Sequence, residues 1–149
     1  MSITTSAVFT IVPAGRRFRL LSLGYGLLMF MWMGPEENVV WPVVLMGVGL
    51  AVLSVTWGIQ RWLVGTSIVG YYVPPCAALT GSIIGVSAIL TTAGLMFFKN
   101  ALHAHVFWDY PPDMIAAMLT RALSWGLAGG LAGLGIGCLW VWRNTFASA

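Results

Sequence analysis

The chain alternates long, uncharged, apolar stretches with short groups of charged residues. Charged side chains are absent from residues 20–35, 38–60, 62–98 and 122–142. An α-helix needs about 20 apolar residues, within a range of about 17–25, to cross the hydrocarbon of a bilayer. The pattern therefore predicts an all-α integral membrane protein, built as a bundle of four transmembrane helices.

The four spans are expected at about residues 18–33, 39–59, 76–98 and 114–142. The first span is short. It crosses only if Arg19 extends its charged end to the headgroups, or if the bilayer thins locally. The other three stretches meet the length requirement without such help.

Two breaks organise these spans. Residues 34–38 form a polar turn, which makes the first two helices an antiparallel hairpin. Residues 60–75 form an apolar connector, because Pro74 and Pro75 lack amide donors and disfavour helix immediately before them. Aromatic residues in the connector, Trp62 among them, favour the headgroup level. We therefore expect the connector to lie at the membrane interface without crossing.

Composition supports the membrane class and excludes others. Of the 149 residues, 59% are hydrophobic and only 7% are charged, and the mean hydropathy is +0.90. A soluble domain carries about 25% charged residues, so the lipid bilayer is the expected surrounding of a single membrane domain. Nucleic acid is not an expected partner, because the one basic cluster, Arg16, Arg17 and Arg19, is better explained as a membrane flank.

The cations are divided unevenly between the two sides of the predicted membrane. With alternating crossings, one side holds Arg16, Arg17, Arg19, Arg61 and Arg143. The other side holds Lys99, Glu36, Glu37, Asp109 and Asp113, with Arg121 nearby. Cytoplasmic loops carry an excess of Lys and Arg. Both termini are therefore expected in the cytoplasm, and the loop at 99–113 outside.

Glycines of the fourth span share one face of the predicted helix. They are Gly126, Gly129, Gly130, Gly133 and Gly137, and Ala122 falls in the same sector. Such a face, a glycine zipper, lets another helix backbone approach closely in lipid. Gly81 and Gly85 of the third span offer a matching small face. The partner of the zipper is thus either the third span or a helix of another subunit, which includes a homo-oligomer.

Candidate chemistry gathers on the expected outer side. His103 and His105 are the only histidines, and Trp108, Asp109 and Arg121 follow them. A metal, haem, quinone or pigment site would draw on these residues, although two histidines are too few for a metal site, which generally has three or four ligands. The simpler interpretation is an aromatic belt with interfacial histidines. Arg121 then extends to the headgroups, while the alternative is a buried, functional arginine.

No pattern in the chain indicates an enzyme. The spans contain no Asp or Glu, and the metalloprotease, serine-hydrolase and phosphate-loop motifs are missing. Two functions are therefore expected. The first is a non-catalytic membrane subunit, or an assembly or stabilising factor, of a larger complex. The alternative is a small membrane binding or transport protein with a site around His103, His105 and Arg121.

Overall fold

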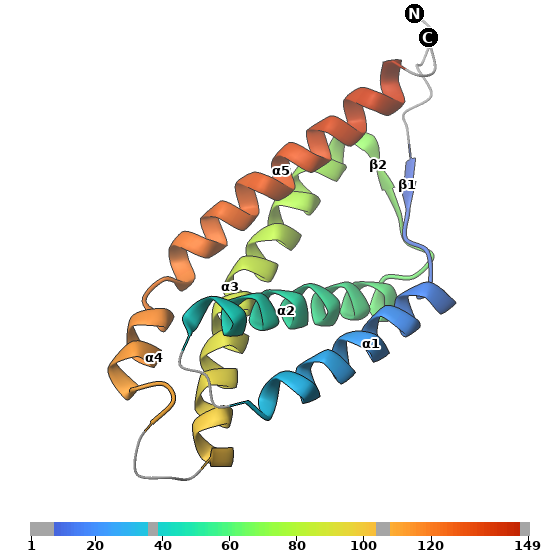
Figure 1. Ribbon diagram of the computed structural model, residues 1–149. Helices are drawn as coiled ribbons and strands as arrows, with labels where there is room; N and C mark the ends of the chain where they lie inside the picture. The colour runs from blue at the N-terminus through green and yellow to red at the C-terminus, as the bar shows by residue number, and fades with distance from the viewer. Residues whose placement is uncertain (1–7, 36–38, 104–107, 147–149) are drawn as a thin grey trace, which may run out of the picture.

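The computed structural model describes residues 8–35, 39–103 and 108–146, and this part of the chain is mostly helical (Figure 1). The helices are α1 (Arg16–Met33), α2 (Val40–Trp62), α3 (Val73–His103), α4 (Pro112–Leu119) and α5 (Ala122–Phe146). A 3-10 helix, η1 (Gly70–Tyr72), precedes α3, and two short strands are β1 (Val8–Thr10) and β2 (Ser67–Val69). Among the described residues, three helical segments are long and apolar enough to cross a membrane: α2, η1 with α3, and α5.

Helix α1 covers the predicted first span but is not one of these three helices. Its 18 residues begin with a turn that contains Arg16, Arg17 and Arg19. The apolar remainder is shorter than the range of about 17–25 residues that a crossing requires. The presence of a fourth spanning helix therefore stays a prediction.

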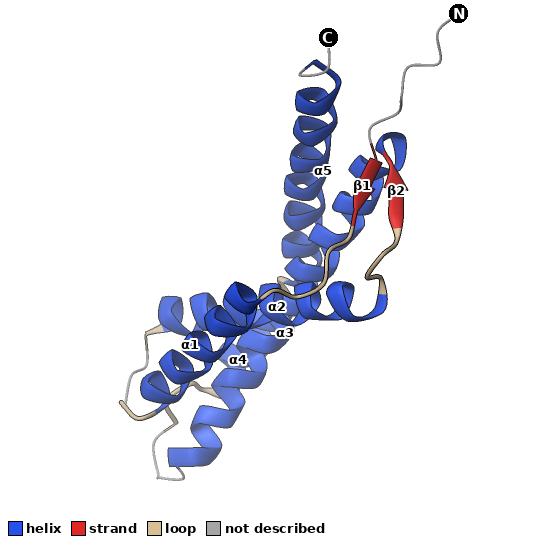
Figure 2. Ribbon diagram, turned by 90° about the vertical axis from the view of Figure 1, so that its right-hand side faces the viewer, coloured by secondary structure: helices blue, strands red, loops and turns tan. Residues whose placement is uncertain are grey.

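The expected helical class is found, and the connector contains in addition a short strand that the sequence did not predict. Strand β2 pairs antiparallel with β1, and Val8 faces Val69 in the register (Figure 2). Gly65, with a φ of 81°, turns the chain between α2 and β2. The β-branched residues of both short segments favour extended backbone. The pairing ties the chain that precedes α1 to the chain that follows α2.

The predicted third span, residues 76–98, lies inside the longer helix α3. The helix begins at Val73, so Pro74 and Pro75 occupy its first turn. Amides in the first turn of a helix have no intrahelical acceptor, so the missing donors of the two prolines cost nothing there. The prolines thus lie at the start of α3, which follows directly on η1.

The predicted fourth span, residues 114–142, is not one helix. It is divided into α4 and α5 by a turn at Thr120 and Arg121. The amide of Arg121 donates to the carbonyl of Met118 at 3.0 Å, and the Thr120 hydroxyl donates to the carbonyl of Ala117 at 2.8 Å. Such local bonds replace the regular α-helical pattern and stop the helix. Figure 1 shows the change of direction between the two helices.

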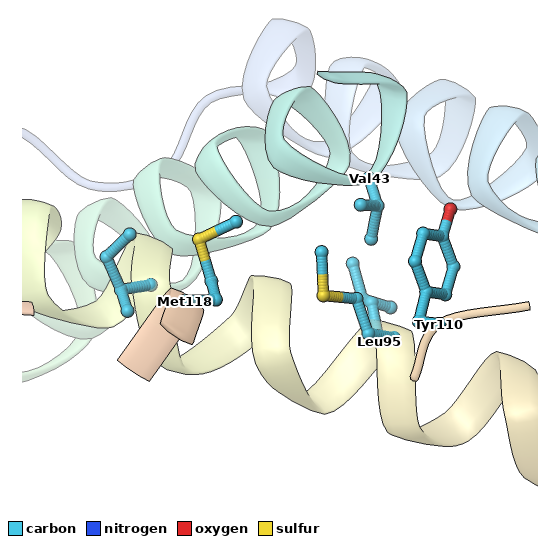
Figure 3. Close-up of a cluster of buried hydrophobic side chains, with 6 residues drawn as sticks. Val43, Leu95, Tyr110 and Met118 are labelled. Carbon is cyan, nitrogen blue, oxygen red and sulfur yellow. The ribbon is translucent and has the colours of Figure 1, made fainter. Parts of the chain in front are cut away.

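Helix α2 lies across α3, and the buried core sits at this crossing (Figure 1). The core cluster comprises Val43, Ile89, Leu95, Met96, Tyr110 and Met118 (Figure 3). The crossing is close because α2 carries Gly47 there. A Cβ atom on Gly47 would lie 2.8 Å from the backbone nitrogen of Thr92. The arrangement is more open than the predicted four-helix bundle, since α2 does not run alongside α3.

Candidate functional site

Helices α3 and α5 meet backbone to backbone along the predicted glycine face. A Cβ atom on Gly81 would overlap the carbonyl group of Gly129, whose carbon would be 2.8 Å away. In the same way, a Cβ atom on Gly133 would lie 2.8 Å from the carbonyl carbon of Ala77. Real Cβ atoms essentially never approach other atoms so closely. The two helices can therefore come this close only where side chains are absent.

The remaining predicted glycines belong to the same contact. A Cβ atom on Gly85 would lie 2.7 Å from the carbonyl carbon of Trp125, and one on Gly137 would lie 2.6 Å from Cα of Pro74. Gly126 faces a methyl group of Val86. Gly130, the fifth predicted glycine of this helix, faces the hydroxyl of Ser82. In this structure the face packs against α3 of the same chain.

At the far end of α3, Asn100 holds the segment that leads into α4. Its side-chain amide donates to the carbonyl of Tyr110 at 2.6 Å, and its side-chain oxygen accepts from the amide of Tyr110 at 2.9 Å. The hydroxyl of Tyr110, in turn, donates to the carbonyl of Val39 at 3.2 Å. One buried tyrosine thus links the start of α2 to the end of α3.

The side chains of His103 and Asp109 form a hydrogen bond one turn beyond Asn100. Nδ1 of His103 lies 2.5 Å from a carboxylate oxygen of Asp109. The two side chains are only 17% and 9% exposed, so water screens the pair weakly. The pair and the Asn100 bonds clamp the same segment, and we refer to Lys99, Asn100, His103, Asp109 and Tyr110 as the α3 clamp.

Lys99, Asn100 and Tyr110 are the clamp residues that sequence reasoning did not single out as site residues, and Lys99 is the charged one. It is fully buried, and its ammonium nitrogen lies 4.5 Å from the ring centre of Trp32 and 6.0 Å from that of Tyr110. Both distances are short enough for cation–π attraction, and the two rings lie among the groups that surround the ammonium group of Lys99. From sequence, Lys99 served only as an orientation signal. Its spacing from buried Thr92 and Met96, at seven and three residues, places it on the buried stripe of α3 and is the signal that would have found it.

The other predicted ligand residues are not assembled with the clamp. Trp108 is 59% exposed, and Arg121 is exposed in the turn between α4 and α5, unlike the buried arginine considered above. His105 lies outside the described residues. Within the described ranges, no three His, Cys, Asp or Glu side chains are grouped so that they could hold a metal ion.

A concave surface feature lies between α1 and α2. It is an open apolar groove of about 790 Å³, lined by Ser22, Tyr25, Gly26 and Met29 of α1 and by residues of α2 that include Leu50 and Trp57. The hydroxyl of Tyr25 crosses it and donates to the carbonyl of Met46. No side chain of α1 is buried.

No family model, curated protein or solved structure matches this chain, so the sites described above are the basis for its function.

Proposed function

We propose that this chain is a non-catalytic integral membrane subunit, or an assembly factor, of a larger membrane complex. The observation that carries the proposal is a second group of small residues on α5. Ser124, Ala128 and Gly135 are exposed on the side of α5 that faces away from α3, together with the larger Leu131, and we call these four residues the outward face. A Cβ atom on Gly135 would meet nothing within 4 Å.

The energetics of helices in lipid favour a partner on this face. Lipid tails are as apolar as leucine, so helices associate through close packing and not through burial of large side chains. A glycine also costs about 1 kcal/mol of helix propensity relative to alanine in aqueous hosts. A face of small residues that met only lipid would gain nothing in return. The opposite face of the same helix illustrates the gain, because it brings α5 onto the backbone of α3.

Burial within the chain agrees with this proposal. Only 17% of the most apolar window of α5 is buried, against 22% for α2 and 39% for α3. Of the three helical segments that are long and apolar enough to cross a membrane, α5 thus has the smallest buried share.

The alternative function, a ligand site at the outer end, receives less support. The clamp residues considered as ligands bind one another, since His103 pairs with Asp109. The side-chain nitrogen and the side-chain oxygen of Asn100 both form hydrogen bonds with the backbone of Tyr110. These hydrogen bonds give the polar residues a structural role, because they link the end of α3 to the residues that precede α4.

The proposal is tested by the mass of the particle in mild detergent. The wild-type protein should exceed the 16.0 kDa of one chain after subtraction of detergent. Gly135→Leu should reduce it to a single chain without changing its melting temperature. Gly94→Leu is the matched control, because Gly94 is an exposed glycine of α3 with nothing within 4 Å. A wild-type particle of 16.0 kDa in nanodiscs would contradict the proposal, and the mass distinguishes a second copy from another protein.

The proposal includes four crossings with both termini in the cytoplasm. Its basis is the unequal distribution of Arg and Lys. The test is labelling of single cysteines at Ser2 and Asn38, after replacement of Cys76 and Cys138 by Ala. A membrane-impermeant reagent applied to intact cells should label position 38 and not position 2. The reverse pattern would invert the orientation, and labelling of both would remove α1 from the spans.

A further inference from the structure

The groove between α1 and α2 ends at a pair of arginines. On α1, Ser22, Gly26 and Met29 line the groove, and Arg19 precedes Ser22 by one helical turn. On α2, Ser54 and Trp57 line it, and Arg61 follows Trp57 by one turn. Arg19 and Arg61 thus flank the lining at the same end of the hairpin, and Trp62 and Leu63 continue the lining of α2 beyond Arg61.

The structure holds these two helix ends together. The amide of Ile11, shortly before α1, donates to the carbonyl of Thr66 at 3.1 Å. The amide of Gly65, shortly after α2, donates to the carbonyl of Ile11 at 3.0 Å. Figure 1 shows that α1 starts and α2 ends on the same side of the molecule. The guanidinium of Arg61 lies 6.0 Å from the ring centre of Trp57, which itself lines the groove.

The interior of the groove suits hydrocarbon. Of its polar side chains, Ser22 donates to the carbonyl of Phe18 at 2.9 Å and Tyr25 donates to that of Met46. These two hydroxyls are already used within the chain, and Ser54 is the one further serine of the lining, so a polar ring or headgroup would find few donors there. An apolar chain loses nothing in such a site, whereas a polar group would lose its hydration.

We propose that the groove binds an anionic phospholipid, with the phosphate at Arg19 and Arg61 and one acyl chain between α1 and α2. The charge pattern selects the headgroup, because the described residues at this end of the hairpin include arginines and no acid. Basic pockets between membrane helices recognise anionic headgroups in this manner. The site is separate from the outward face of α5, so the inference rests only on the part of the proposal that places α1 and α2 in the membrane.

The lipid also explains how α1 is held. The helix has no buried side chain, and the groove leaves a gap where helices in lipid would otherwise pack closely. An acyl chain fills this gap and restores the missing contacts along α2. The lipid thus acts as part of the α1–α2 interface.

The test is native mass spectrometry of the full chain, delipidated in mild detergent and offered equal amounts of phosphatidylglycerol and phosphatidylcholine with the same acyl chains. One phosphatidylglycerol per chain should be retained in preference to phosphatidylcholine. The double variant Arg19→Gln/Arg61→Gln should bind it about 30-fold more weakly. Arg17→Gln/Arg143→Gln removes the same charge away from the groove, and its affinity should stay within about threefold of wild type. Equal retention of both lipids, or unchanged affinity in the first double variant, would overturn the proposal.

A second pair of variants tests the acyl chain separately. Gly26 lines the groove and Gly24 does not, yet a Cβ atom on either would meet nothing within 4 Å. Gly26→Leu should fill the groove and abolish retention of phosphatidylglycerol, while Gly24→Leu should retain it. Glycerol phosphate, which has the headgroup charge without chains, should not compete. Full competition by glycerol phosphate, or equal retention in both glycine variants, would contradict a lipid site.

Discussion

Two antiparallel helix pairs of this chain pack in opposite ways. In the pair α3–α5, Gly81 faces Gly129 and Ala77 faces Gly133, so backbone atoms meet directly. In the pair α1–α2, the helices are separated by a groove of about 790 Å³ and bridged by the hydroxyl of Tyr25. Both pairs are rich in apolar residues, so hydrophobicity does not explain the difference.

The two helix pairs differ in the positions of their small residues. Helices α3 and α5 place glycines opposite glycines and alanines, which removes every obstacle to close approach. Helix α1 also carries glycines, but a Cβ atom on Gly24 or Gly26 would meet nothing within 4 Å. Glycine thus gives close packing in a membrane only when the facing helix is shaped to use it. The first pair is complete within the chain, and the second leaves room for another molecule.

The largest expected effect is in the tight pair. Gly133→Leu places a side chain against the carbonyl of Ala77 and should destabilise the chain by about 3 kcal/mol, because backbone cannot move aside as a flexible side chain can. Gly135→Leu, two residues away in open space, should change stability by about 0.5 kcal/mol or less. Unfolding by SDS in mixed micelles measures both. Equal effects would show that the α3–α5 contact contributes little. Leu134→Ala, at an exposed position, should also be mild.

A second comparison uses two glycines of α2. Gly47→Ala should cost about 2 kcal/mol, because the new Cβ atom would lie 2.8 Å from the backbone nitrogen of Thr92 at the crossing with α3. Gly49→Ala meets only the ring of Tyr25, at 2.5 Å, and this ring can swing toward the groove. The change in stability at Gly49 should therefore stay near zero, helped by the higher helix propensity of alanine. A larger loss of stability at Gly49 than at Gly47 would mean that α2 packs more tightly against α1 than against α3.

Sequence reasoning located the helices better than the contacts between them. The lengths of uncharged apolar stretches placed α2, α3 and α5, three helices that are long and apolar enough to cross a membrane. The same signal could not detect the three-residue strands β1 and β2, because short apolar strands inside apolar stretches show no distinctive period. The break at Thr120 and Arg121 was also missed, because Arg121 alone interrupts the apolar pattern there and the break depends on local hydrogen bonds.

The candidate site was predicted only in part. His103 and Asp109 were both singled out, but as ligands for an external group, whereas the structure pairs them with each other. The burial of Lys99 depends on Trp32 and Tyr110, which come from distant parts of the chain. Helical spacing can place Lys99 on a buried stripe, but it cannot supply the aromatic rings that lie beside it.

The clamp at the end of α3 should have a smaller effect than either glycine contact. A double-mutant cycle with His103→Ala and Asp109→Ala should give a coupling energy of about 1 kcal/mol, because the pair is mostly buried but sits near the protein surface. The coupling should change little at high salt, because the pair is mostly buried. Tyr110→Phe in the same background is an independent control, since its hydroxyl bonds to Val39 and not to the pair. A coupling energy of zero would mean that the two residues are free to bind another group.

The smallest expected effect is that of Tyr25→Phe in the loose pair. The substitution removes the hydroxyl that donates to the carbonyl of Met46 and keeps the ring. That carbonyl lies within α2, where the regular helical pattern gives it a second donor, so no buried acceptor is left unsatisfied. A typical hydrogen bond contributes about 0.5–1.5 kcal/mol, and the loss here should be at the lower end. The measurement is SDS unfolding of wild type and variant, each with and without added phosphatidylglycerol. If the groove holds a lipid, the added lipid should stabilise both proteins equally, because the hydroxyl binds α2 and not the lipid. A loss comparable to that of Gly133→Leu would mean that one hydrogen bond holds α1 as firmly as the glycine contact holds α5, and the contrast between the two pairs would disappear.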